Sequence, residues 1–551
     1  MAPWTRRQAI SRMGMAAAVP LLSSCTEESG GAPEPGGTAG STSPGPSPSS
    51  APIDPESVVE TRSLSTNLGQ IEIAVHPIIR VGDHCVLTLD IETIRLPDGE
   101  DSMLLSRFTG DATLAGGAVH PEDWAGVRLV DTGGGQVRLA ATAEDHTVAG
   151  RSTWPRSVFA KVYGGTLRRQ LIFAAPEEGT EQIGLLLPGW FLPEVPVLDG
   201  EVPEVEPGDD EQELPDTEMM LAAVTEAPVL LLEGYSRQLD GGVQVLESNE
   251  KIEIRLAGDV LFDSSSYELD ARADEVLAAA AQSITGYAGG VVEIVGHTDD
   301  VGTEADNQEL SENRAQAVAE DLGARIDISV YELRTGGRGE SEPLVPNDSD
   351  ENRQQNRRVT LTLTSEKSSQ VEVTTSGEMP PFDDGVLHDG TEADGPEGFD
   401  RTLVEGSRYH ISCPVVRRVE GMLEVTVQAE RLEGGEYGSY GSAVTLGAGV
   451  HSYRGNDTGY SRDFAGFAPR LLVGATATYP LDYLLGTSSG GTDEEWRIVS
   501  DQQPMDQCLV GETVRFVALY RDLPGLDTIV VEQPFVLGTT PFRLTGIPIQ
   551  G

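Results

Sequence analysis

The chain has 551 residues and is strongly acidic, with 89 Asp and Glu residues against 38 Lys and Arg residues and a formal net charge of −51. A surface with this charge repels nucleic acids and anionic lipid head groups, so neither is an expected partner. A chain of this length predicts about three or four domains.

Residues 1–25 have the layout of an export signal. Arg6 and Arg7 give a basic start, residues 13–22 form an apolar stretch, and the run Leu22-Ser23-Ser24-Cys25 ends it. The apolar stretch is too short to span a membrane. The paired arginines resemble a twin-arginine signal, and an ordinary Sec-type signal is the alternative. We therefore expect an exported protein.

The end of this signal resembles a lipobox, in which the cysteine becomes the lipidated first residue of the mature chain. Cys25 is thus the predicted lipidation site. Residues 26–56 are mostly Gly, Pro, Ser, Thr and Ala and contain no aromatic residue. Such a segment cannot bury enough apolar surface to fold. It is expected to be a disordered tether between a lipid anchor in the membrane and the folded part.

Residues 57–200 show short strand-like runs, such as 71–75 and 86–91, separated by Gly, Asp and Pro turns. This pattern predicts a β-sandwich domain. Residues 398–551 behave likewise, and the run that begins at Pro77 resembles the run that begins at Pro414. The two regions are therefore interpreted as a possible duplicated immunoglobulin-like module. Acidic segments at 201–237, which includes a connecting strand, and at 367–397 are expected to link them to the middle of the chain.

The middle segment, residues 238–366, carries a different pattern. The apolar run 291–295 predicts a short buried strand that ends close to Asp299. Apolar residues then recur at helical intervals, with Asp306 and Glu309 spaced like a capping pair. Helices are expected near 269–285 and 307–322, on one face of a small mixed sheet. The expected strands lie around Val260, Val291, Thr335 and Val359.

The most specific signal is an ordered set of short motifs. They are Gly296-His297-Thr298-Asp299, then Asn307, Leu310-Ser311 and Arg314, and finally Asn356-Arg357-Arg358-Val359. Residues 241–364 thereby resemble the OmpA-like peptidoglycan-binding domain. The resemblance implies an α/β domain whose ligand is the diaminopimelate of a peptidoglycan stem peptide. One departure is the last loop, where Asn352-Arg353 stands near the place of the family's usual Gly-Arg pair.

In that family the residues that match Asp299 and Arg314 hold the ligand. The chemistry agrees, because a carboxylate can take an ammonium group while a guanidinium grips a carboxylate with two hydrogen bonds. Thr298 and Asn307 are weaker ligand-binding candidates that are expected to orient the loop. The alternative is that Asp299 ends the strand and forms a structural salt bridge with Arg314. Arg357 and Arg358 cannot face the same side of one strand.

Three cysteines remain after the signal, which is an odd number for an exported chain. Cys413 and Cys508 lie in one predicted domain and are the candidate disulfide, whereas Cys85 is expected to be a small buried residue. The cysteine spacing does not suggest zinc. The acidic run 348–352 lacks the glycine and distal glutamate of a calcium loop and is expected to be a solvated turn.

The sequence thus predicts a multidomain α+β protein of the cell envelope that binds peptidoglycan without a covalent bond and faces the cell wall. The predicted partners are peptidoglycan, the membrane through the lipid, and envelope proteins through the β-sandwich domains. The alternative is an adhesion or assembly scaffold whose OmpA-like domain is only structural. No cofactor, metal or enzymatic activity is expected, because the Gly-x-Ser-x-Gly match at 486–490 lacks the strand and helix that a nucleophile elbow requires.

Overall fold

The structure, a computed structural model, describes residues 53–66, 69–104, 124–152, 161–206, 214–365, 377–385, 387–403, 406–434, 469–487, 494–500, 509–534 and 540–551. The export signal, nearly all of the tether, Cys25 and Cys508 lie outside these residues. None of the helices in the described ranges is both long and apolar enough to cross a membrane.

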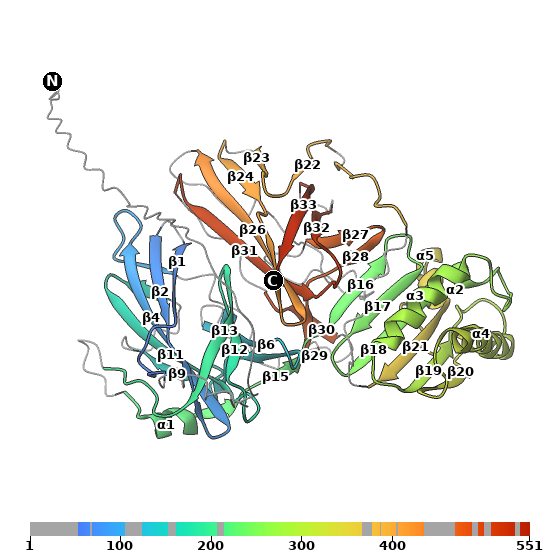
Figure 1. Ribbon diagram of the computed structural model, residues 1–551, viewed down its shortest axis with the longest axis horizontal. Coiled ribbons are helices and arrows are strands. Elements are labelled where there is room, and N and C mark those ends of the chain that lie inside the picture. The colour runs from blue at the N-terminus through green and yellow to red at the C-terminus, as the bar shows by residue number, and fades with distance from the viewer. Residues whose placement is uncertain are drawn as a thin grey trace, which may run out of the picture. The chain divides into compact units, whose positions relative to one another are not determined.

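The central part is a mixed sheet with helices on one face (Figure 1). Its strands follow one another in space as β20-β19-β21-β18-β17-β16, and only β19 and β20 are parallel. The strands are β16 (Gly234–Gln238), β17 (Val243–Glu247), β18 (Lys251–Ala257), β19 (Gly290–Gly296), β20 (Tyr331–Gly337) and β21 (Arg358–Thr364). The helices are α2 (Gly258–Leu261), α3 (Ala273–Thr285), α4 (Glu304–Arg325) and α5 (Asp350–Asn356).

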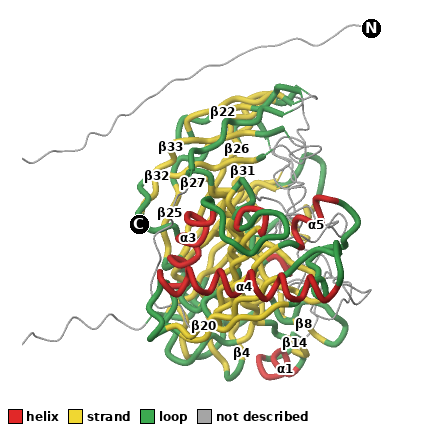
Figure 2. Tube along the Cα trace, turned by 90° about the vertical axis from the view of Figure 1, so that its right-hand side faces the viewer, coloured by secondary structure: helices red, strands yellow, loops and turns green. Residues whose placement is uncertain are grey.

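Alternation along the strands places the apolar side chains of the sheet on the face that carries α3 and α4. Ile254, Ile294 and Leu361 are fully or almost fully buried there, together with Ala280 of α3 and Val318 of α4. Figure 2 looks onto this part from the side and shows the long helix α4 nearest the viewer. The expected arrangement of two helices on one face of a mixed sheet is therefore confirmed.

Several expected boundaries were wrong. Val260 lies in α2 and not in a strand, because β18 ends at Ala257. Helix α4 begins at Glu304, with Thr303 as its N-cap: the Thr303 side chain accepts from the backbone N–H of Asp306. The capping pair is thus Thr303 and Asp306, one turn before the predicted pair of Asp306 and Glu309.

The region before the central part is built from strands with little helix. Its elements are β1 (Glu60–Thr66), β2 (Gly69–Val75), β3 (Ile78–Val81), β4 (His84–Arg95), β5 (Ser102–Leu104), the 3-10 helix η2 (Trp124–Gly126), β6 (Arg128–Asp131), β7 (Gln136–Leu139), β8 (Thr142–Ala143), β9 (Gly150–Ser152), β10 (Lys161–Tyr163), β11 (Thr166–Ala174), β12 (Gln182–Leu187) and β13 (Trp190–Asp199). Side chains from β2, β4 and β11 share one buried core with side chains from β6, β12 and β13.

The region after the central part is also built from strands. Its elements are β22 (Thr391–Asp394), β23 (Phe399–Thr402), β24 (Arg408–Ser412), β25 (Val416–Val419), β26 (Met422–Glu433), β27 (Arg470–Val473), β28 (Thr476–Thr478), β29 (Asp482–Thr487), β30 (Glu494–Ile498), β31 (Thr513–Arg521), β32 (Thr528–Gln533) and β33 (Phe542–Gln550). It has its own buried core, which includes Cys413.

The two flanking regions share one strand order. The first runs β1-β2-β4-β3-β13-β12-β6-β7 and ends with β15 (Val229–Leu231), and the second runs β23-β24-β26-β25-β33-β32-β27-β28-β16. In each region a nine-residue strand, β11 or β31, also pairs antiparallel with the long strand, β4 or β26. Each order includes one parallel pair, β3 with β13 and β25 with β33. This correspondence supports a duplicated module, whereas its immunoglobulin-like identity stays a prediction.

The segment expected to be an acidic linker contains α1 (Thr217–Ala222), β14 (Val224–Glu226) and β15 (Val229–Leu231) before it reaches β16. Strand β15 pairs with β7 of the first region, and β16 pairs with β28 of the second region and with β17 of the central sheet. Two consecutive strands of this segment therefore extend the sheets of both flanking regions.

Cys85 and Cys413 are buried free thiols in the described part of the chain. Burial is the main cause that raises the pKa of each thiol to about 12. A free Cys413 counts against the predicted disulfide. Its expected partner Cys508 lies outside the described residues, so the pairing stays a prediction.

Candidate functional site

The candidate site lies where β19 ends and α4 begins. Strand β19 approaches α4 so closely that a Cβ atom on Gly296 would lie 2.1 Å from the backbone oxygen of Ser311, which explains why this position carries a glycine. Gly296 opens the loop that holds His297, Thr298 and Asp299. The close contact between strand and helix thus places Asp299 beside the first turns of α4.

Asp299 is buried, with 8% of its surface exposed, and both carboxylate oxygens have donors. Its Oδ2 accepts from Nη1 of Arg357 at 2.6 Å, and its Oδ1 accepts from the backbone N–H of Val301 at 3.1 Å. A carboxylate held by a cation and a backbone donor keeps one orientation. The structural salt bridge considered from the sequence is therefore formed with Arg357 and not with Arg314.

Arg314 lies on α4 and is buried, with 4% of its surface exposed. Its Nε donates to the backbone oxygen of Ser266 at 2.9 Å, and its guanidinium carbon lies 5.1 Å from the centre of the Phe262 ring. Within the described residues its two terminal nitrogens have no hydrogen-bond partner. Burial lowers the pKa of Arg314, and Asp259 and Asp299 oppose that effect. A guanidinium fixed through Nε with two remaining nitrogens can bind a carboxylate.

Arg357 links the site to the short helix α2. Its Nε and Nη2 donate to the two oxygens of Asp259 at 2.8 and 2.7 Å, while Nη1 reaches Asp299. Asp259 raises the pKa of Arg357, and Arg357 in turn lowers the pKa of Asp259. Sequence reasoning missed Asp259, because no local pattern shows that a residue after β18 will meet one before β21.

Of the two weaker candidates, Asn307 makes hydrogen bonds through its side chain and Thr298 only through its backbone. The side-chain nitrogen of Asn307 donates to the backbone oxygen of Asp299 at 3.2 Å and to Oε2 of Glu340 at 2.6 Å. The backbone N–H of Thr298 donates to the oxygen of Gly339 at 2.9 Å, and its hydroxyl has no partner within the described residues. A ligand contact by either residue stays a prediction.

His297 is a buried neighbour of the site. Its Nδ1 has no hydrogen-bond partner within the described part of the chain, and only 5% of its surface is exposed. Burial, followed by the nearby charges of Arg358 and Arg338, lowers its pKa to about 3. His297 is therefore neutral at physiological pH.

The segment that departs from the family pattern is helical. Residues 350–356 form α5, and the Ser349 side chain caps it by accepting from the backbone N–H of Asn352. No residue of this helix has a positive φ. Arg353 of this helix donates to Asp300 at 3.1 Å, next to Asp299. No cluster of metal-ligating side chains is found in the described ranges, which include 348–352.

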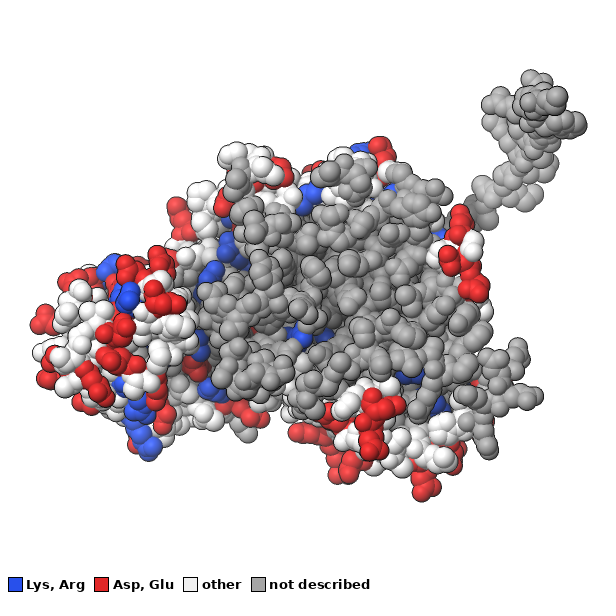
Figure 3. Space-filling view, turned by 180° about the vertical axis from the view of Figure 1, so that it is seen from behind, with Lys and Arg blue, Asp and Glu red and all other residues white. Residues whose placement is uncertain are grey.

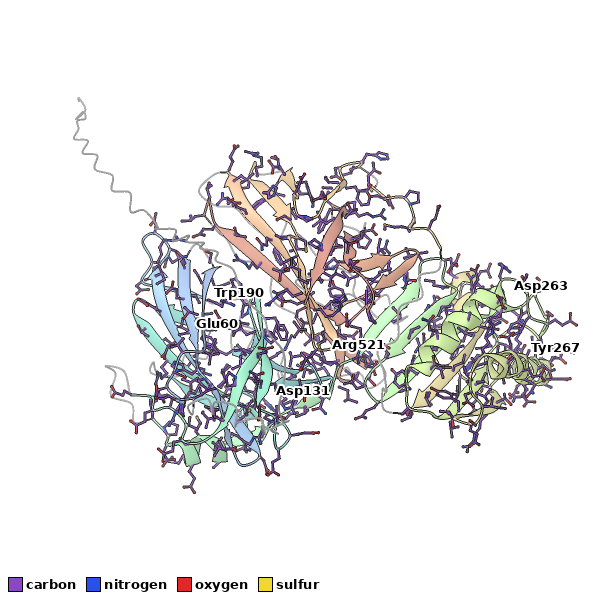
Figure 4. The ribbon with its side chains drawn as sticks, viewed as in Figure 1. Glu60, Asp131, Trp190, Asp263, Tyr267 and Arg521 are labelled. Atoms are coloured by element: carbon purple, nitrogen blue, oxygen red, sulfur yellow. The ribbon has the colours of Figure 1, made fainter. Side chains whose placement is uncertain are left out.

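The rim of the site includes the loop between α2 and α3. Figure 4 shows Asp263 and Tyr267 at the right-hand edge of the central part. Tyr267 is half exposed, and the residue before it, Ser266, binds Arg314. Figure 3 shows acidic and basic side chains interspersed on the face of this part that is seen from behind.

The arrangement defines a class of protein: an α/β domain with a carboxylate and a partly unpaired guanidinium at one edge of its sheet. Residues 261–357 match the model of the OmpA family, so this segment is an OmpA family domain. This match contains Asp299, Arg314 and Arg357 and confirms the resemblance noted in the sequence.

Segments of the chain are also similar to known proteins. A segment is 34% identical over 122 residues to "Probable lipoprotein YiaD" of Escherichia coli, which covers 22% of this chain and 55% of YiaD. Another match is 35% identical over 106 residues to "Outer membrane porin F" of Pseudomonas aeruginosa, covering 19% of this chain and 30% of the porin. The chain therefore spans about half or less of these relatives.

A similar solved structure is that of the cell wall anchor of the T6SS from Pseudomonas aeruginosa. It is 32% identical and covers 23% of this chain and 89% of that chain, with a TM-score of 0.21.

Proposed function

We propose that this chain is a lipid-anchored cell-envelope protein that binds peptidoglycan non-covalently through the diaminopimelate of the stem peptide, and so links a membrane to the cell wall. The OmpA family domain at residues 261–357 supports peptidoglycan binding. The names of relatives, a lipoprotein and an outer membrane porin, support a place in the cell envelope.

The observation that carries this proposal is the state of Arg314. A buried guanidinium without partners for its terminal nitrogens is unfavourable unless a ligand or water satisfies them. Asp259, Asp299, Arg314 and Arg357 carry two negative and two positive charges, which balance within this group. A ligand group with no net charge but separated ends suits such a site. The free end of diaminopimelate is such a zwitterion, with one ammonium and one carboxylate group.

In the proposed complex the ligand carboxylate binds the terminal nitrogens of Arg314, and the ligand ammonium binds Asp299. Asn307 holds the loop through the backbone oxygen of Asp299. Charge-assisted hydrogen bonds of this kind are about twice as strong as neutral ones. A lysine in the same place of a stem peptide lacks the second carboxylate, so Arg314 also gives the site its selectivity.

The remaining parts have supporting roles in this proposal. Cys25 carries the lipid, and the tether that follows holds the folded part away from the membrane surface. The two flanking β regions act as spacers or bind other envelope proteins. A scaffold with a merely structural OmpA family domain is the second candidate function. The altered loop at Asn352-Arg353 was the feature that favoured this scaffold function. That loop forms α5, and its Arg353 is bound to Asp300.

Co-sedimentation with purified sacculi tests the proposal. The protein without its signal, residues 26–551, should sediment with sacculi that contain diaminopimelate and much less with sacculi that contain lysine. Asp299→Ala and Arg314→Ala should both lose this binding. Arg325→Ala is the matched control, because Arg325 lies on the same helix but pairs with Asp321 and Asp274. Full binding by both folded site variants would leave only the scaffold function.

A further inference from the structure

Arg357 uses its whole guanidinium group within the protein. Two nitrogens bind the two oxygens of Asp259 at 2.8 and 2.7 Å, and the third binds Asp299 at 2.6 Å. When two nitrogens of a planar guanidinium group are fixed on one carboxylate, the third nitrogen points in a defined direction. The position of Asp299 therefore depends on a residue that does not touch it.

The backbone fixes the same contact. The N–H of Gly258 donates to the backbone oxygen of Arg357 at 2.8 Å. A Cβ atom on Gly258 would lie 2.8 Å from that oxygen, so only glycine allows this approach. Helix α2 is thus attached to Arg357 through the backbone of Gly258 and the side chain of Asp259. These bonds leave Arg357 little freedom to move away from Asp299.

The arrangement keeps two opposite charges apart. Asp299 and Arg314 are close enough for the charge of Asp299 to raise the pKa of Arg314, yet no hydrogen bond joins them. Each oxygen of Asp299 accepts one hydrogen bond, from Arg357 or from the N–H of Val301, which fixes the carboxylate and leaves each oxygen a second lone pair for a ligand. Without Arg357, Asp299 would be a buried carboxylate that has lost its cation, and a direct pair with the nearby guanidinium of Arg314 would fill the site.

From these contacts we infer that Asp259 is a positioning residue of the ligand site: it holds Arg357, which keeps the carboxylate of Asp299 apart from Arg314 and so leaves both groups available to a zwitterion. This inference rests on the proposed function. It deepens that function by assigning a role to two residues that need not touch the ligand. Asp259 acts only through Arg357, so its effect must disappear when Arg357 is absent.

A double-mutant cycle tests the inference. Residues 26–551 are titrated with a soluble stem tripeptide that contains diaminopimelate, using Asp259→Asn, Arg357→Met and the double variant. We expect Asp259→Asn to weaken binding about tenfold, as losses of supporting partners around bound groups do. Arg357→Met should weaken binding at least as much, and the double variant should bind no more weakly than Arg357→Met alone. Asp259→Glu should restore part of the loss.

The matched control is Arg353→Gln, because Arg353 pairs with Asp300 and Asp350 in the same region. If Asp259→Asn does not fold, Arg357→Lys provides the second variant, since lysine keeps the charge beside Asp299 but cannot form the fork to Asp259. Arg357→Lys should then bind the tripeptide more weakly than the parent. The pH dependence of its binding should also differ from that of the parent.

The outcomes separate the two claims. A parent protein that binds neither tripeptide nor sacculi overturns the proposed function and this inference together. A parent that binds, with Asp259→Asn and Arg357→Lys folded and equally tight, overturns the inference and leaves the function in place. Additive losses in the double variant also overturn it, because Asp259 would then act by a route other than Arg357.

Discussion

Arg357 and Asp299 are 58 positions apart in the chain and form an ion pair of 2.6 Å between Nη1 and Oδ2. The alternative considered from the sequence paired this carboxylate with Arg314. Arg314 instead donates to a backbone oxygen through Nε and keeps its two terminal nitrogens without partners in the described residues.

Blocking one charged group of the ligand should weaken binding only when the protein residue that contacts it is present. Amidation of the free diaminopimelate carboxylate should weaken binding by about 2 kcal/mol in the parent, because it removes a charge-assisted contact to Arg314. In Arg314→Ala the same amidation should have little effect. Acetylation of the free amine should likewise weaken binding in the parent and have little effect in Asp299→Asn. Calorimetric titration measures all four combinations. Equal effects of amidation in the parent and in Arg314→Ala would contradict the assignment of the carboxylate.

His297 should make the protein less stable in mild acid. Its pKa is 6.5 as a free group and about 3 in the folded protein. Between these values the unfolded chain binds a proton that the native protein does not, so stability is lost as the pH falls below about 6.5. The expected loss is about 1 to 2 kcal/mol between pH 7.5 and pH 5. Urea unfolding of the parent and His297→Gln at both pH values measures it; an identical loss in both proteins would exclude His297 as its source.

Gly296→Ala should destabilise the central part by about 2 kcal/mol or more, because its Cβ would lie 2.1 Å from the backbone oxygen of Ser311. Gly323→Ala is the matched control. It lies within α4, and its Cβ would meet only side chains at 3.5 Å or more. Alanine is the better helix former, so this variant should gain about 0.5 to 1 kcal/mol. Thermal unfolding compares the two, and equal stabilities would show that β19 and α4 separate easily.

Cys25→Ser should release the protein from membranes. Cys25 lies outside the described residues, and the expectation rests on the lipobox-like run before it. A buried acyl chain contributes about 0.8 kcal/mol per methylene group, and the tether offers no apolar surface to replace it. Membrane fractionation after digestion of the sacculi, with metabolic lipid labelling, measures the change. Persistence of the serine variant in the membrane fraction would identify a different anchor.

Cys85 should not react with thiol reagents in the native protein, because it is buried and its pKa is raised to about 12. It should react once the protein is unfolded. Alkylation of residues 26–551 under native and denaturing conditions, without reductant, gives both counts. The denatured count also decides the state of Cys413: one thiol means that Cys413 and Cys508 are bonded, and three mean that both are free. Rapid native labelling of Cys85 would contradict its burial.

The sequence by itself determined the central domain. The strand at 290–296 and the helix that holds Arg314 produce periodic apolar patterns, which depend on neighbours only a few residues away. The short motifs around Asp299, Arg314 and Asn356 identified the family for the same reason. The sequence also indicated the strand-rich flanking regions and their similarity. It did not give helix α5, since seven polar residues without apolar periodicity resemble a loop.

Only the tertiary structure decided which charged groups meet. Asp299 had Arg314, Arg353, Arg357 and Arg358 as possible partners, and their spacing in the chain does not distinguish them. The choice depends on the approach of β21 to β19 and of α2 to Arg357, which are contacts between distant segments. The pairing of β16 with both β17 and β28 is of the same kind. Local patterns determine elements, because each turn or pleat repeats within a few residues, whereas ion pairs and sheet neighbours depend on how those elements pack in space.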